Sequence, residues 1–360
     1  MANENSFPVR KGFRWFKAVF LVILFAAGNL HALSVAEFGA VGDGKTDDAP
    51  AFQKAIDRAA ARNEPLEIGE GTFFLGSDLV IEQPLKLLGE GHTRSVFTGN
   101  GGNARIFVRA SGTEFHRIGF EDMIEPIALE PRADSVLRDL VFQYCRFENI
   151  LIAHQNRGTI GLSSGSSEQR KFRIENLTVR ECLFRKIDAH AINIRSNIFG
   201  AQILNNLFLD LVNDPASPSP EGGYAIRLGD SADHGDLGEF QGQHLISGNQ
   251  VRGLSKKSVE GNLKAFLIYG DYNTIDSNRI EAVDATAEGM DANAMYIRGS
   301  FNRIVSNFIR DVRGADDDGA LSLKGGMANG NHSNIIAWNV VEKIDGMSAV
   351  EVSTSDLFFF

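Results

Sequence analysis

Apolar and polar residues recur along most of the chain in a nine-residue phrase. Ile275–Val283 reads I-D-S-N-R-I-E-A-V and Ile304–Val312 reads I-V-S-N-F-I-R-D-V, with apolar residues at the first, sixth and ninth places and Asn at the fourth. The fourth place falls at Ile118, Cys145, Cys182, Asn206, Asn249, Asn278, Asn307 and Asn339, at intervals of 24–43 residues. A repeat of about 20–50 residues indicates a solenoid, and the Val, Ile and Phe content with Asn and Gly turns predicts coils built of strands.

A second strand precedes most copies of the phrase. The copies read A-I-N-I-R at Ala191, A-I-R-L-G at Ala225, A-F-L-I-Y at Ala265, A-M-Y-I-R at Ala294, A-L-S-L-K at Ala320 and A-V-E-V-S at Ala349. Side chains alternate faces along a strand. The second and fourth residues of each copy should therefore point into the coil, and the third and fifth should point outward.

The outward residues should form two columns, because parallel strands stack about 4.8 Å apart. The first column contains Asn193, Arg227, Leu267, Tyr296, Ser322 and Glu351, and the second contains Arg195, Gly229, Tyr269, Arg298, Lys324 and Ser353. We expect the cationic and phenolic members to share one exposed face: Arg195, Arg227, Tyr269, Tyr296, Arg298 and Lys324. Stacked cations repel one another, so this face should attract an anion.

The buried positions of the phrase have a structural interpretation. Asn at the fourth place should point inward and form a ladder of side-chain amides at a turn. Cys145 and Cys182 fill the same place in consecutive copies, and we expect them to be free buried thiols rather than a disulfide. Residues 49–61 have a helical period with Asp48 at the N-cap. Short strands are expected at 66–68, 71–75, 79–81 and 85–88.

The N-terminal residues indicate where the protein is located, and the net charge argues against one class of partner. Four basic residues between Arg10 and Lys17 precede an apolar run, Ala18–Ala27, that is shorter than the roughly 20 residues needed to span a bilayer. We interpret residues 1–32 as an export signal. The protein would then be secreted or periplasmic, with no stable membrane insertion after cleavage. The formal net charge of −10 argues against a nucleic-acid partner.

The string E-F-G-A-V-G-D-G-K-T-D-D-A-P-A-F-Q-K-A-I-D, Glu37–Asp57, resembles the opening of the pectate-lyase-like superfamily. The resemblance implies an all-β, right-handed parallel β-helix (solenoid) with a short N-terminal capping helix. Residues 33–92 would form the cap and first coils, and residues 93–360 the remaining coils of one continuous domain. It also implies a carbohydrate-active protein.

An acidic polysaccharide is the expected substrate, and β-elimination at uronic acid residues the expected chemistry. That reaction needs a cation for the carboxylate and a base for the C5 proton, and Arg, Lys and Tyr suit these tasks. The candidate catalytic residues are Lys324, Arg298 and Tyr296. The candidate substrate-binding residues are Arg195, Arg227, Tyr269, Asn193 and His332.

Other chemistries remain open. Hydrolysis would use paired carboxylates, and Asp291, Asp317 and Asp318 faintly resemble those of polygalacturonase-like hydrolases, with His332 beside them. The same site could perform C5-epimerisation, and a non-catalytic glycan-binding or exopolysaccharide-assembly protein would keep only the binding face. Calcium, if it is used, would be held by Asp316 and Asp318. The sequence does not decide whether the chain forms a homo-oligomer.

Overall fold

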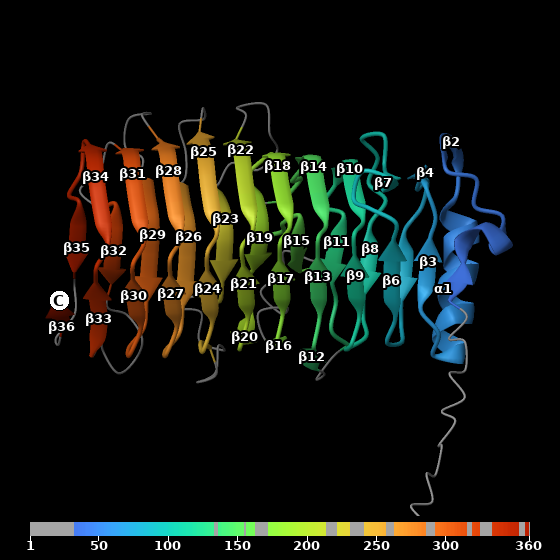
Figure 1. The fold of residues 1–360 in the computed structure, drawn as a ribbon, viewed down its shortest axis with the longest axis horizontal. Coiled ribbons are helices and arrows are strands. Elements are labelled where there is room, and N and C mark those ends of the chain that lie inside the picture. The colour runs from blue at the N-terminus through green and yellow to red at the C-terminus, as the bar shows by residue number, and fades with distance from the viewer. Residues whose placement is uncertain are drawn as a thin grey trace, which may run out of the picture. The chain divides into compact units, whose positions relative to one another are not determined.

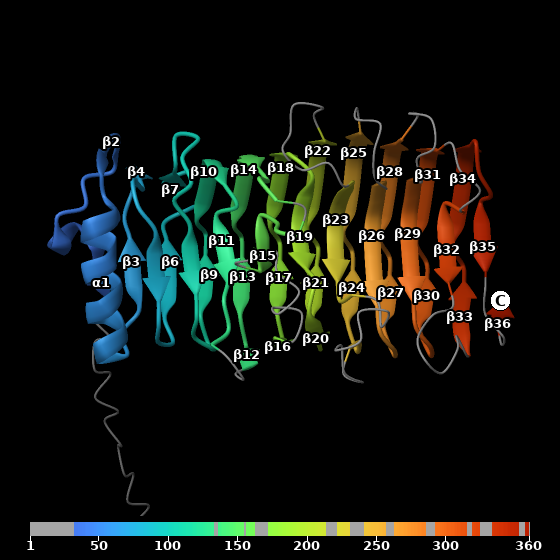
Figure 2. The same cartoon turned by 180° about the vertical axis from the view of Figure 1, so that it is seen from behind.

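The computed structural model describes residues 32–132, 136–154, 156–162, 172–213, 222–230, 241–256, 263–285, 292–314, 319–324, 333–352 and 357–359. Within residues 32–359, coils follow one another from α1 (Ala49–Arg62) at one end to β36 (Leu357–Phe359) at the other, and most coils add one strand to each of three parallel sheets (Figures 1 and 2). The expected right-handed parallel β-helix with a capping helix is confirmed. In the described part of the chain, no helix is long and apolar enough to cross a membrane.

Sheet A has 12 strands and contains the first residues of the repeated phrase. Its strands, in spatial order, are β1 (Leu33–Ser34), β3 (Leu66–Ile68), β6 (Lys86–Gly89), β9 (Glu114–His116), β13 (Val141–Gln143), β17 (Thr178–Arg180), β21 (Gln202–Leu204), β24 (Leu245–Ser247), β27 (Thr274–Asp276), β30 (Arg303–Val305), β33 (Asn334–Ala337) and β36.

Sheet B has 11 strands and contains the last residues of the phrase. Its strands are β2 (Asp43–Asp47), β4 (Gly71–Phe74), β7 (Ser95–Thr98), β10 (Gly119–Ile124), β14 (Arg146–Leu151), β18 (Leu183–Ile187), β22 (Leu207–Asn213), β25 (Gln250–Lys256), β28 (Arg279–Asp284), β31 (Phe308–Arg313) and β34 (Val340–Asp345).

Sheet C has 10 strands and contains the Ala-led strands. Its strands are β5 (Leu79–Ile81), β8 (Ile106–Val108), β11 (Ile127–Leu129), β15 (Ile160–Leu162), β19 (His190–Ile194), β23 (Gly223–Leu228), β26 (Leu263–Tyr269), β29 (Ala292–Arg298), β32 (Leu321–Lys324) and β35 (Val350–Val352). A small sheet D joins β12 (Val136–Arg138), β16 (Arg173–Glu175) and β20 (Asn197–Phe199).

The N-terminal end of the coil stack is covered by the short 3₁₀ helix η1 (Val35–Phe38) and by α1. The apolar face of α1 is buried, and the Phe52 ring lies 5.1 Å from that of Phe73 and 4.9 Å from that of Phe97. Asp48 stands at the N-cap position but makes no capping bond. Its carboxylate instead accepts from the N–H groups of Val41 and Gly42, so it holds the preceding loop.

The core confirms the expected direction of the side chains. The apolar second and fourth residues of the first five Ala-led strands, among them Ile192, Ile194, Met295 and Ile297, are fully buried, whereas Val350 in the last of these strands is 38% exposed and Val352 is partly buried. The sixth place of the phrase contributes a column of stacked rings at 4.8–4.9 Å: Phe120, Phe147, Phe184 and Phe208. Identical groups therefore lie over one another from coil to coil, which is how each repeat of a solenoid buries the next.

The asparagine ladder is also confirmed. Nδ2 of Asn278 donates to Oδ1 of Asn307 at 3.0 Å, and its own Oδ1 accepts from both the backbone N–H and Nδ2 of Asn249 at 3.0 Å. The same bonds link the other neighbours from Asn206 to Asn339. The residue before each ladder position adopts a left-handed conformation, for example Ser277 at φ 55°. The ladder satisfies the buried polar groups at this turn.

A second ladder at the other end of sheet A was not predicted. Its members are His244, Asn273, Asn302 and Asn334, and each ring or amide accepts from the backbone N–H one coil earlier. All four are buried, and burial lowers the pKa of His244 to about 3. His244 is therefore neutral at physiological pH. Asn273, Asn302 and Asn334 recur at the repeat spacing, so the sequence carried this signal.

Cys145 and Cys182 continue the first ladder toward the N-terminus. Both are free and buried, as expected. The backbone N–H of Cys145 lies 3.4 Å from Sγ of Cys182, and that of Cys182 donates to Oδ1 of Asn206 at 2.9 Å. Burial raises the pKa of the Cys182 thiol well above its usual value, so the thiol is protonated.

Asn278→Ala should lower the free energy of unfolding by about 2–4 kcal/mol, because each buried polar group left without a partner costs about 1–3 kcal/mol. The change removes the acceptor of the Asn249 backbone N–H, one of the acceptors of Asn249 Nδ2, and the side-chain donor to the carbonyl oxygen of Ile246. Chemical denaturation measures the effect. Ser277→Ala is the matched control, since Ser277 is exposed and its hydroxyl bonds only to Asp276. Equal losses in both variants would contradict a structural role of the ladder.

Neither thiol should react with a thiol reagent while the protein is folded, because both are buried and the thiolate is the reactive form. Both should react quickly in denaturant without added reductant. Mass spectrometry of labelled protein counts the modified residues. Labelling of the folded protein would show that the ladder is open at Cys145 or Cys182, and unlabelled denatured protein would show a disulfide.

Candidate functional site

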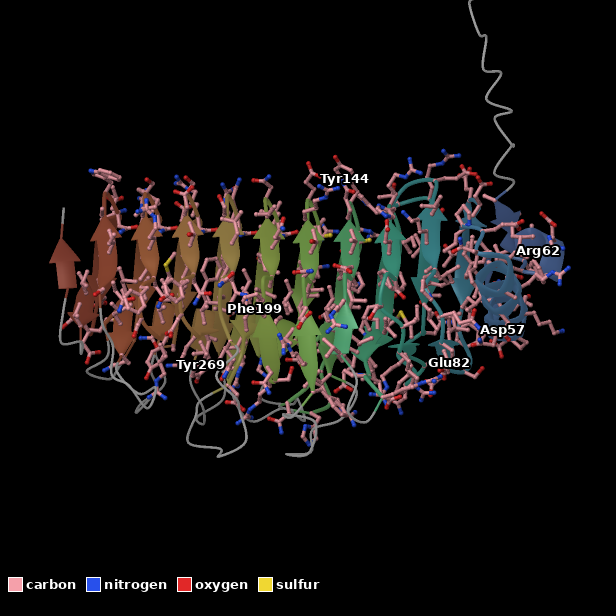
Figure 3. The ribbon with its side chains drawn as sticks, turned by 90° about the horizontal axis from the view of Figure 1, so that it is seen from below. Asp57, Arg62, Glu82, Tyr144, Phe199 and Tyr269 are labelled. Carbon is pink, nitrogen blue, oxygen red and sulfur yellow. The ribbon has the colours of Figure 1, made fainter. Side chains whose placement is uncertain are left out.

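The outer face of sheet C brings together most of the residues expected at the site. The strand register pairs Asn193 with Arg227, Arg227 with Leu267, Leu267 with Tyr296 and Tyr296 with Ser322. It also pairs Tyr269 with Arg298 and Arg298 with Lys324. In Figure 3, Tyr269 and Glu82 label the side of the stack that carries sheet C, and Tyr144 lies on the opposite side. The first predicted column is therefore in register from Asn193 to Glu351, and the second from Tyr269 to Lys324.

The expected exposure of this face is wrong. Asn193 and Ser322 are fully buried, Leu267 is 3% exposed, Arg227 5% and Tyr269 7%. Tyr296 and Arg298 are half-buried, and the side chains of Arg195 and Lys324 are 14% and 20% exposed. Strand alternation fixes which way a side chain points, but it does not reveal what lies over it. Asn193 itself donates to the carbonyl oxygen of Arg157 at 2.8 Å, so its amide serves the fold.

Two of the cations are neutralised within the chain by Asp230. Nε of Arg195 donates to one oxygen of Asp230 at 2.7 Å, and Nη2 of Arg227 donates to the other at 2.8 Å. Burial opposes the charge of Arg227, but the neighbouring Tyr224, Tyr269 and Asp230 raise its pKa above the usual value. The anion that stacked cations require is thus supplied in part by the protein.

Aromatic side chains surround the Arg227 guanidinium. Its central carbon lies 5.4 Å from the ring centroid of Tyr224 and 6.0 Å from that of Tyr269. Tyr224, Tyr269 and Leu267 form a small apolar cluster with Tyr296 packed against it. Burial raises the pKa of Tyr269, although Arg227 and Arg298 act to lower it. The Tyr269 phenol is therefore protonated at neutral pH and is unsuited to accept a proton.

Tyr296 lies near two cations. Nζ of Lys264 is 4.4 Å from the centre of its ring, and the Arg298 guanidinium carbon is 5.6 Å from it. Lys264 is 6% exposed and donates to Oδ1 of Asn293 at 2.6 Å. Arg298 has no carboxylate partner in the described part of the chain, and its buried Nε makes no hydrogen bond. Arg298 thus differs from Arg195 and Arg227.

Glu351 organises the last described coils of the face. Its carboxylate pairs with Lys324 and lies 3.4 Å from the hydroxyl of Ser322 and 3.3 Å from the N–H of Gly319. Asn293 donates to the carbonyl oxygen of Gly319 at 2.7 Å. Lys324 is therefore held in place as a paired cation.

Lys264, Asn293, Tyr224 and Asp230 were not selected from the sequence. Tyr224, Lys264 and Asn293 each precede the Ala of an Ala-led strand and align in register, so they form a third outward column. The aligned Ala-led strands therefore predict this third column at the residue directly before each Ala. Asp230 follows β23 outside any repeat, and only the fold shows that it reaches two arginines.

The predicted acidic residues Asp291, Asp316, Asp317 and Asp318, and the predicted His332, lie outside the described residues. Gly319 is described, so the segment that follows Asp318 enters sheet C beside Glu351. Within the described ranges, no group of three or more His, Cys, Asp or Glu side chains is placed to hold a metal ion.

The beginning of the chain matches a known family. Residues 32–117 match the family described as "Rhamnogalacturonase A/epimerase, pectate lyase-like". An 86-residue stretch is 37% identical to a polygalacturonase-named protein of Arabidopsis thaliana, covering 23% of this chain and 17% of that one. Together with the coil stack, these matches confirm the resemblance of Glu37–Asp57 to the pectate-lyase-like β-helix superfamily.

Solved structures resemble the chain more distantly. The A-module of the mannuronan C-5 epimerase AlgE4 from Azotobacter vinelandii is 14% identical, with a TM-score of 0.43, over 91% of this chain and 98% of that one. The DFA-IIIase of Arthrobacter chlorophenolicus A6 is 12% identical, with a TM-score of 0.46, over 86% of this chain and 84% of that one. These resemblances carry no information on the chemistry of this chain.

Proposed function

We propose that the protein binds an acidic polysaccharide along the outer face of sheet C and cleaves it by β-elimination at a uronic acid residue. The proposal rests on Arg298. Arg195, Arg227 and Lys324 each pair with a carboxylate of the chain, whereas Arg298 is half-buried and pairs with none among the described residues. A guanidinium in that state is suited to bind the carboxylate of a ligand.

The residues around Arg298 suit the steps of an elimination. Neutralising the C6 carboxylate acidifies the C5 proton. Tyr296, which lies near Lys264 and Arg298, accepts this proton as a phenolate. The C4–O bond breaks as the C4–C5 double bond forms, and Lys324 donates a proton to the leaving oxygen. Glu351 holds Lys324 in position.

Hydrolysis is the second candidate, because the matched relative is named as a polygalacturonase. The carboxylates for this reaction would be Asp291, Asp317 and Asp318.

The superfamily resemblance supports a carbohydrate-active protein in either case. It also supports an export signal at residues 1–32, one continuous domain beyond it, and a secreted or periplasmic location.

Arg298→Ala should lower the turnover of an acidic polysaccharide about 100-fold to 1,000-fold, the usual effect of removing one group that stabilises developing charge. The melting temperature should change little, because Arg298 has no buried ionic partner in the described chain. Arg303→Ala is the matched control, since Arg303 is exposed on sheet A. Full activity of Arg298→Ala on a substrate that the native protein cleaves would refute the assignment.

The reaction type can be read from the products of polyuronates and acidic exopolysaccharides. Elimination creates an unsaturated uronate, and ultraviolet absorbance should rise with each bond cleaved. Hydrolysis creates reducing ends without that rise, and would transfer the catalytic role to Asp317 and Asp318. Binding of the polymer without either product, measured by calorimetry, would identify a glycan-binding or epimerising protein instead.

A further inference from the structure

Asp230 occupies a site that has the form of a ligand-binding site. Its two oxygens are bound by arginines from consecutive strands of sheet C, Arg195 beyond β19 and Arg227 within β23. The side chain of Asp230 is 2% exposed, and those of Arg195 and Arg227 are 14% and 6%. One arginine for each oxygen is an arrangement by which proteins bind the carboxylate of a ligand.

The position of Asp230 is also fixed through its backbone. Its N–H donates to Oε1 of Gln241 at 2.9 Å, and its carbonyl oxygen accepts from Nε2 of the same side chain at 3.2 Å. Gln241 is 6% exposed. The carboxylate of Asp230 is therefore presented to the arginines by a support that does not depend on them.

We propose that Arg195 and Arg227 form a carboxylate-binding fork and that Asp230 is its built-in ligand. While Asp230 is in place, the two arginines are closed to a carboxylate of the substrate. Recognition of that carboxylate falls to Arg298, two strands further along sheet C than Arg227. Asp230 thus determines the coil at which an acidic sugar binds. This role rests on the proposed function, whereas the existence of the fork does not.

Asp230→Ala should create a vacancy of carboxylate size between two cations, and formate should fill it. A ligand that binds only the folded state raises the melting temperature. Sodium formate should therefore raise the melting temperature of Asp230→Ala by several degrees more than it raises that of the native protein. Sodium chloride at the same ionic strength and neutral formamide should not reproduce the difference. Equal effects of formate and chloride on the variant would overturn the fork.

Two further measurements keep the test decisive. If Asp230→Ala does not fold in chloride, its refolding yield in formate replaces the melting temperature, and equal yields in both salts would refute the fork. The double variant Asp230→Ala with Arg227→Met retains one arginine. It should lose the selective effect of formate, and persistence of that effect would place the formate site elsewhere.

The role in specificity has its own measurement. Asp230→Ala removes the internal carboxylate and opens the space between the two cations, so the KM for an acidic polysaccharide should fall several-fold and formate should become a competitive inhibitor. Glu148→Ala is the matched control, because Glu148 is a buried carboxylate held by Arg146 and Arg185 on sheet B. It should change stability and leave KM unaltered.

The outcomes separate the two proposals. An unchanged KM in Asp230→Ala, together with selective rescue of its melting temperature by formate, would retain the fork and refute its role in specificity. Absence of turnover of any acidic polysaccharide by the native protein would refute the proposed function, and the melting temperatures in formate would still decide whether the fork exists.

Discussion

The hydrogen bonds between stacked asparagine side chains fix the register of one coil on the next, and the position of every outward residue depends on that register. Each amide of the ladder bonds to the amide and backbone of a neighbouring coil inside the core. A shift of a strand by one residue would move its apolar side chains outward and would leave these amides unpaired. The ladder therefore specifies one stacking among several that the apolar residues alone would allow.

A fixed register brings like charges together, and the protein compensates them differently on its two polar faces. On sheet B, cations and carboxylates are direct neighbours: Glu148 pairs with Arg146 on its own strand and with Arg185 on the next, so these charges are compensated without a ligand. On sheet C, the expected columns contain mostly cations and phenols. One compensating carboxylate, Asp230, comes from outside the columns after β23, and the other, Glu351 on β35, stands at the end of the first column. Arg298 lies between these two carboxylates along the stack and pairs with neither. The charges of sheet B are thus accounted for within the fold, whereas sheet C retains a cation without a carboxylate partner among the described residues.

The parts of the structure that repeat could be predicted, because many aligned copies agree on which residues point inward even where one segment alone would not decide it. Ile192, Ile194 and their counterparts show one phase in copy after copy, and the structure confirms that phase. Burial of the outer face could not be predicted, because it depends on residues that do not repeat. The same holds for Asp48, which has the sequence position of a helix cap but binds Val41 and Gly42 instead. Local pattern gives the position of a side chain, and only tertiary contacts give its partner.

A row of cations can be interpreted only when both the direction of each side chain and the group that it pairs with are known. From the sequence, Arg195, Arg227, Arg298 and Lys324 are equivalent members of a basic stripe. In the fold, burying a charge is costly unless it is paired, and three of the four have an internal carboxylate that meets this cost. A ligand carboxylate would have to displace Asp230 or Glu351 to reach those three, whereas at Arg298 it displaces no carboxylate of the described chain. Within the described residues, the cation without an internal carboxylate is therefore the better candidate for binding an acidic sugar, and the paired cations set the shape and charge of the surface around it.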